Sequence, residues 1–155
     1  MGRVTATSTM DVHAPAAAVA EAVADYAQVR PRILPEQYSA YRVLEGGQGT
    51  GTRAAWNLRA TKKRNRDVDA TVTVSGTPDT HVEIVEEDAN STMVTTYVVR
   101  STAGGSLVEM TTSWDGAKGI GGFFERTFAP GGLKKIQHEL LENLRVDVEG
   151  SAGRA

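Results

Sequence analysis

The chain contains no cysteine, which excludes disulfide bonds, thiolate nucleophiles and cysteine-ligated metal sites. It has no run of about 18 apolar residues that could cross a membrane, and its first residues, MGRVTATSTMDV, lack the apolar core of a secretory signal. The formal net charge is only −2, so no overall field favours nucleic acid or an anionic membrane surface. We therefore expect a cytoplasmic protein with no integral membrane segment and no nucleic-acid partner.

Large apolar side chains are also scarce. The hydrophobic class makes up 40% of the 155 residues, but 20 residues are Ala and 17 are Val. A chain of this length is expected to form one domain with one core. Because small side chains fill little volume, that core is expected to contain space for a guest molecule. An empty apolar void costs about 24 cal/mol per Å³, which an apolar ligand would recover.

Hydrophobic periodicity predicts the order of the secondary structure. Residues 3–12 alternate like a half-buried strand, and AAAVAEAVADYA after Pro15 has the spacing of a short amphipathic helix. Prolines at 31 and 35 leave room for only one further turn of helix. Residues 119–149 again have helical spacing, with a kink or break expected at Pro130-Gly131-Gly132, and residues 150–155 are expected to be a disordered tail.

Six short runs rich in Val and Thr lie between these helical segments, separated by turn signals. They predict an antiparallel meander. The runs are SAYRVLE, TRAAWNLRA, RDVDATVTVS, HVEIVEE, TMVTTYVVRS and SLVEMTTSW.

The stretch GGQGTGT at residues 46–52 raises the question of a phosphate-binding loop. A dinucleotide loop needs Gly-x-Gly-x-x-Gly at the start of a helix, whereas Gly47, Gly49 and Gly51 are followed by an alternating strand. A nucleoside triphosphate loop is excluded as well, because no Lys-Ser or Lys-Thr pair follows. We therefore interpret the stretch as a tight turn in which glycines supply positive φ angles.

The order of these features resembles the START/Bet v 1-like (SRPBCC) superfamily, and within it the polyketide cyclase/dehydrase and lipid transport group. The resemblance rests on Asp25, Tyr26, Pro31 and Leu34-Pro35, then VLEGGQGTGT, a meander and a long final helix. It implies a single α+β domain over residues 1–149 with a helix-grip fold. In that fold a curved seven-stranded antiparallel sheet wraps around a long C-terminal helix, with two short helices between strands 1 and 2. Members include carriers, cyclases and regulators, so the fold does not identify a substrate.

Strand alternation nominates residues that would line an internal cavity between sheet and helix. The run TMVTTYVVRS is ambiguous, and we take the face of Tyr97 as the inward one. Ordinary core packing remains an alternative role for every candidate. The candidate ligand-binding residues are Tyr26, Ile33, Leu34, Trp56, Leu58, Val72, Tyr97, Met110, Thr112, Trp114, Phe128, Leu133, Ile136 and Leu140.

Motifs for other chemistry are weak. HELLE at 138–142 lacks the second histidine of a zinc protease helix, and the acidic run at 86–88 is typical of an exposed edge or turn, so we expect no metal and no cofactor. A nucleophile turn of the G-x-S-x-G type is absent, and no general base stands out. If the protein catalyses cyclisation, donors would come from Arg59, Arg66, Tyr97 or Arg100, but alternation turns Arg59 and Arg100 outward.

The leading hypothesis is therefore a non-catalytic carrier that binds a hydrophobic small molecule or lipid, acting as a monomer or weak homodimer. An aromatic polyketide cyclase/dehydratase is the alternative, and it requires a polar pair that faces inward. A module that regulates a protein partner is a third class.

Overall fold

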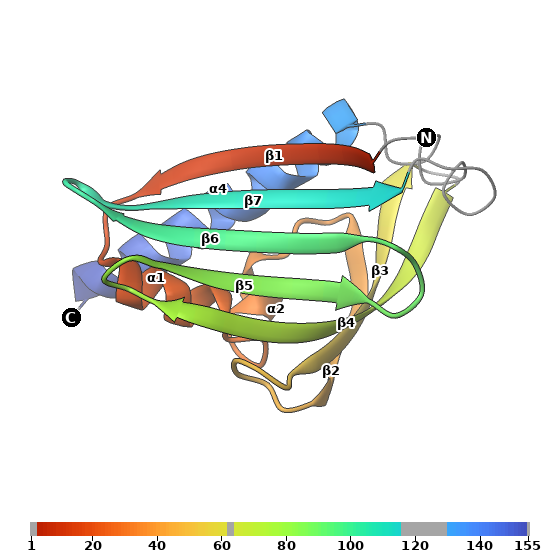
Figure 1. Ribbon diagram of the computed structural model, residues 1–155, viewed down its shortest axis with the longest axis horizontal. Coiled ribbons are helices and arrows are strands. Elements are labelled where there is room, and N and C mark those ends of the chain that lie inside the picture. Colours follow the sequence, from red (N-terminus) through yellow and green to blue (C-terminus); the bar gives the residue numbers. More distant parts are fainter. Residues whose placement is uncertain (1–2, 62–63, 116–129, 155) are drawn as a thin grey trace.

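The computed structural model describes residues 3–61, 64–115 and 130–154 (Figure 1). The described strands are β1 (Arg3–Val12), β2 (Tyr38–Glu45), β3 (Arg53–Thr61), β4 (Arg64–Thr77), β5 (His81–Asp88), β6 (Val94–Thr102) and β7 (Gly105–Asp115). The described helices are α1 (Ala16–Val23), α2 (Arg30–Ile33) and α4 (Pro130–Arg154). This order matches the order predicted from periodicity, including the two short helices between the first two strands.

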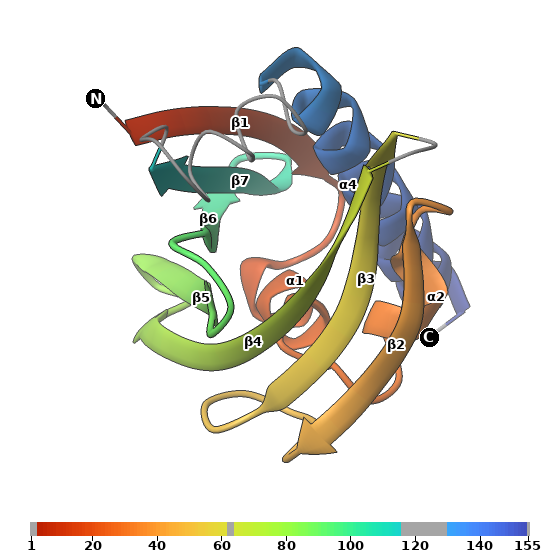
Figure 2. The same ribbon diagram turned by 90° about the vertical axis from the view of Figure 1, so that its right-hand side faces the viewer.

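The seven strands form one antiparallel sheet in the order β1-β7-β6-β5-β4-β3-β2. Viewed from the end, the sheet curves strongly, so that its edge strands β1 and β2 approach α4 from two sides (Figure 2). Helices α1 and α2 lie within the open side of this curve. The helix-grip fold expected from the sequence is confirmed.

The two halves of the sheet differ in regularity. Strands β1 and β7 pair without interruption from Arg3 opposite Asp115 to Val12 opposite Ser106. Between β2 and β3 the register shifts twice, and Ala40 takes a positive φ of 54°. Because an extra residue in one strand bends it and increases its twist, these shifts help β2 and β3 turn towards α4.

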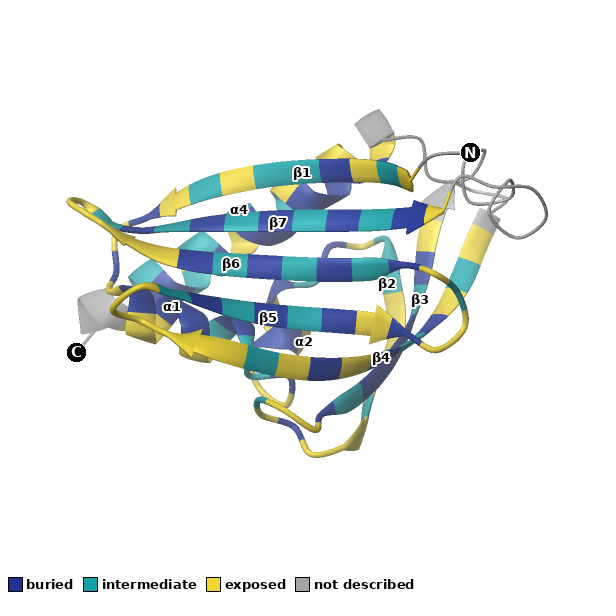
Figure 3. Ribbon diagram, viewed as in Figure 1, coloured by how far each residue is buried: buried dark blue, intermediate teal, exposed yellow. Residues whose placement is uncertain are grey.

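Burial alternates along the strands, as the alternating sequence predicts (Figure 3). In β7 the residues of one parity are buried from Ser106 to Trp114, while their neighbours are partly exposed. In β6, Tyr97 and Val99 are buried, so the choice of the Tyr97 face is confirmed. The inward faces of sheet and helices form one hydrophobic core.

The glycine stretch is a structural turn between β2 and β3, as expected. Gly47 has a φ of 141°, and its carbonyl accepts hydrogen bonds from the backbone N–H groups of Tyr26 and Ala27 at 2.8 and 3.0 Å. The N–H of Gly49 donates to the carbonyl of Ala24 at 3.0 Å. The loop therefore holds the segment between α1 and α2, and with it the side chain of Tyr26.

Helix α4 differs from the expected one at its C-terminal end. The sequence predicted a disordered tail from residue 150, whereas the helix continues to Arg154. Extending an existing helix adds a backbone hydrogen bond for each residue fixed, so small polar residues such as Ser151 can prolong it. The helical segment expected over residues 119–129, with Phe128, lies outside the described residues.

Candidate functional site

Arg30 is the most unusual side chain of the concave interior, because it is charged and only 2% exposed. It stands at the first residue of α2, four residues after Tyr26. Its Nη2 atom donates to the carbonyl of Val23 at 2.9 Å, one of the carbonyls left without a partner where α1 ends. Its position is thus fixed by the ends of two helices.

Glu86 of β5 is the counter-ion of Arg30. The Oε2 atom of Glu86 lies 2.6 Å from Arg30 Nη1, and the hydroxyl of Tyr26 donates to the same oxygen at 2.5 Å. Glu86 is 5% exposed, so the carboxylate is removed from water but held by two strong donors. The prediction of an exposed edge or turn at residues 86–88 is wrong for Glu86 and for Asp88. Asp88 is buried as well, and its carboxylate accepts hydrogen bonds from backbone N–H groups.

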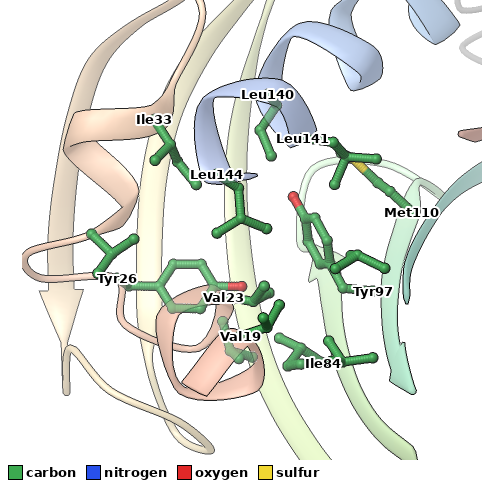
Figure 4. Packing of buried hydrophobic residues seen from close by; sticks show 14 of the residues in the cluster. Val19, Val23, Tyr26, Ile33, Ile84, Tyr97, Met110, Leu140, Leu141 and Leu144 are labelled. Carbon is green, nitrogen blue, oxygen red and sulfur yellow. The ribbon is translucent and has the colours of Figure 1, made fainter. Parts of the chain in front are cut away.

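Aromatic rings enclose this ion pair. The Arg30 guanidinium carbon lies 4.2 Å from the ring centre of Tyr26 and 5.1 Å from that of Tyr97, both within the range of cation–π contact. Tyr26 and Tyr97 point into the same interior from the α1–α2 segment and from β6 (Figure 4). Tyr41 joins the group, because its hydroxyl donates to the Tyr26 carbonyl at 2.5 Å.

All four tyrosines of the chain belong to this cluster and resist ionisation. Burial raises the pKa of Tyr26 and of Tyr97 well above the ordinary value, and the Glu86 carboxylate adds to both effects although Arg30 opposes them. Burial likewise raises the pKa of Tyr38, and it raises that of Tyr41 to about 12. Each hydroxyl therefore stays a neutral group at neutral pH.

Two donors of the cluster have no acceptor among the described residues. They are Arg30 Nε and Trp56 Nε1, and both atoms are buried. Trp56 of β3 packs against two tyrosine rings. Its ring centroid lies 6.1 Å from that of Tyr38 and 6.0 Å from that of Tyr41. A buried donor without an acceptor costs free energy, so each is a place where a ligand acceptor would be stabilising.

A second buried polar group has a structural role instead. Gln137 of α4 is fully buried, and its Nε2 atom donates to the Ala6 carbonyl at 3.0 Å and to Thr112 Oγ1 at 3.2 Å. Its Oε1 accepts from Ser8 at 2.9 Å, and Thr112 also shares a hydrogen bond with Thr95. Because these groups satisfy one another, the network fixes α4 to β1 and β7 and leaves the Thr112 hydroxyl occupied.

The structure places most of the predicted ligand-binding residues on the inward face. Ile33, Tyr97, Met110 and Leu140 surround the same interior as Tyr26 (Figure 4). Leu34 is partly buried against the core, and Phe128 lies outside the described residues. Their contact with a ligand stays a prediction. The buried candidates are Tyr26, Ile33, Trp56, Leu58, Val72, Tyr97, Met110, Thr112, Trp114, Leu133, Ile136 and Leu140.

Sequence reasoning did not nominate Arg30 and Glu86, although the pattern held a signal for each. Val82 and Ile84 are apolar at alternate positions of β5, and continuing this parity turns Glu86 inward. Arg30 follows Tyr26 at a spacing of four, which places it on the buried side of the segment. Of the donors proposed for cyclisation, Arg59 and Arg100 are exposed as alternation predicted, and Arg66 donates to the Asn90 carbonyl.

The described residues line two hollows on the outside of this core. One of about 300 Å³ lies between α1, α2 and the end of α4, where Arg32 reaches Asp147. The other, of about 250 Å³, lies at His13 beside the β6–β7 turn. None of the described candidate residues lines either hollow. Among described residues, no group of three or more potential metal ligands occurs, and no helix is long and apolar enough to cross a membrane.

Comparison with known proteins identifies the family. The family of polyketide cyclase/dehydrase and lipid transport proteins matches residues 3–149. The solution structure of KanY protein is 53% identical, with a TM-score of 0.85 over 96% of this chain and 99% of that one. No curated protein matches.

More distant structures share the fold. Ara h 8.0201 is 14% identical, with a TM-score of 0.65 over 96% of this chain and 99% of that one. A norcoclaurine synthase mutant from Thalictrum, in complex with a transition-state analogue, is 12% identical, with a TM-score of 0.70 over 97% of each chain. Because the family match spans nearly the whole chain, the protein belongs to the polyketide cyclase/dehydrase and lipid transport family.

Proposed function

We propose that the protein is a carrier that binds a hydrophobic small molecule or lipid between the concave face of its sheet and α4. The observation that carries this proposal is the pair of buried donors without acceptors among the described residues, Arg30 Nε and Trp56 Nε1, beside a large buried apolar cluster. Ligand sites in proteins are mostly apolar with a few placed polar groups, and this interior has that composition. Membership of a family that includes lipid transport proteins agrees with it.

The carrier proposal is tested on freshly purified protein by native mass spectrometry, followed by organic extraction of any bound molecule. We expect a co-purified apolar passenger, or saturable uptake of Nile red, a neutral apolar dye, by protein freed of its passenger. The Arg32→Met variant is the matched surface control and should take up the dye like the unaltered chain. Absence of both a passenger and dye uptake would contradict the proposal.

Cyclisation or dehydration of an aromatic polyketide is the second candidate function. It required a polar pair facing inward, and Arg30 with Glu86 is such a pair. In that reaction the Arg30 guanidinium would polarise a carbonyl oxygen, while the surrounding rings hold the chain in a folded shape. Incubation with reactive poly-β-ketone chains should then change the product distribution, and the Arg30→Met variant should abolish the change. Identical product distributions with and without protein would contradict the cyclase function, and the carrier function would then be the one that stands.

A further inference from the structure

The donors of Arg30 are only partly used within the protein. Nη1 binds Glu86 and Nη2 binds the Val23 carbonyl, but Nε has no acceptor among the described residues. The rings of Tyr26 and Tyr97 approach the guanidinium within cation–π distance. Nε is therefore a buried donor whose hydrogen bond the described residues leave unmade, and an acceptor oxygen of a ligand beside it would satisfy that bond.

The charge of this group is already balanced. Glu86 neutralises Arg30 at 2.6 Å, so the pair presents a hydrogen-bond donor without a net positive charge. The other described groups in contact with the pair are tyrosine side chains and a backbone carbonyl, all uncharged at neutral pH. A ligand carboxylate placed here would lose its hydration and lie near the Glu86 carboxylate, which are two unfavourable effects.

Resting on the proposed carrier function, we propose that the Arg30–Glu86 pair selects neutral ligands that carry an acceptor oxygen, such as a ketone or an ester, and rejects free carboxylates. Arg30 Nε supplies the hydrogen bond to the acceptor. Glu86 supplies the discrimination, because it removes the positive charge that would otherwise attract an anion. A hydrocarbon without oxygen would still bind through apolar contact, but more weakly.

The test uses three probes of nearly the same shape at neutral pH: methyl 2-naphthoate, 2-naphthoate and 2-ethylnaphthalene. Their affinities are measured by displacement of Nile red. For the unaltered protein we expect the ester to bind at least tenfold more tightly than the acid and about tenfold more tightly than the hydrocarbon, as a hydrogen bond to a charged donor implies.

Two variants separate the roles of the pair. Glu86→Gln leaves the Arg30 charge unbalanced, so the ratio of acid to ester affinity should rise at least tenfold. Arg30→Met with Glu86→Gln removes both charges and keeps an acceptor for the Tyr26 hydroxyl. In this double variant the ester should lose its advantage over the hydrocarbon, while the acid stays excluded. The double variant also keeps the test informative if Glu86→Gln alone fails to fold.

The outcomes separate this inference from the carrier function. If Nile red and the hydrocarbon bind but the acid and the ester bind equally, the selection by charge is wrong and the carrier function stands. The same conclusion follows if the double variant keeps the full preference for the ester over the hydrocarbon. If neither Nile red nor any of the three probes binds, the carrier function fails and the inference fails with it.

Discussion

Arg30 and Arg32 stand two residues apart in α2, yet they occupy opposite environments. The Arg30 side chain is 2% exposed and lies 2.6 Å from Glu86, whereas the Arg32 side chain is 51% exposed and lies 3.0 Å from Asp147. Two residues of a helix rotate the side-chain direction by about 200°, which turns one arginine inward and the other to solvent. An arginine–carboxylate pair therefore behaves differently on the two sides. Water screens the charges of the outer pair, whereas each buried charge of the inner pair is stabilised only by its protein partners.

High pH should have the largest effect on the inner side, because all four tyrosines surround Arg30 and Glu86. Their pKa values are raised in the folded state, so the unfolded chain loses protons first as pH rises above 10.0. The stability that they contribute is complete below this pH and is lost above it. The two fully buried tyrosines alone lower the free energy of unfolding by about 3 kcal/mol per pH unit in this range.

We therefore expect cooperative unfolding between pH 10 and about 12, the pKa of Tyr41. Tyrosinate absorbance and circular dichroism should change together. A tyrosine ionisation step near pH 10 that leaves the folded signal intact would show that at least one ring is more accessible than the structure indicates.

Removing the inner cation should have the next largest effect. Arg30→Met leaves Glu86 buried without its counter-ion, which typically costs about 3–5 kcal/mol. The double variant Arg30→Met with Glu86→Gln should recover most of this loss, because no charge then remains buried. Urea denaturation measures both free energies of unfolding. A double variant as unstable as the single one would mean that packing of the arginine, rather than the charge of Glu86, controls stability.

The inner side of the molecule is also where prediction from the sequence both succeeds and fails. Alternation of apolar and polar residues correctly placed Trp56 and Trp114 inside, because a half-buried strand has a strict period of two, whereas it left the face of the Tyr97 strand open. The fold followed from the order of such runs. Arg30 and Glu86 were missed because charged residues are rarely fully buried, and their burial is stable only when both come together from segments 56 residues apart. Local patterns can indicate that each residue faces inward, but they do not show that the two side chains meet.

A substitution at Tyr26 measures how much its hydroxyl, rather than its ring, stabilises the Arg30–Glu86 pair. Tyr26→Phe keeps the ring over Arg30 but removes the donor to Glu86 Oε2, and a hydrogen bond to a charged group contributes about 1.5–3 kcal/mol. The free energy of unfolding should fall by this amount in urea. Tyr41→Phe is the matched control, since its hydroxyl donates to a backbone carbonyl and its loss should cost less. Equal losses for the two variants would argue against a special role of Glu86 as acceptor.

Arg32→Met repeats the Arg30→Met change on the outer side of the same helix and should have the smallest effect. Arg32 Nε and Nη2 each donate to Asp147 at 3.0 Å, but water can solvate both groups when the pair is broken. The melting temperature should change little at low salt and not at all at high salt, because ions screen exposed pairs. A loss as large as that of Arg30→Met would show that the contact between α2 and α4 is as important for stability as the buried pair, and burial alone would then not explain the difference between the two arginines.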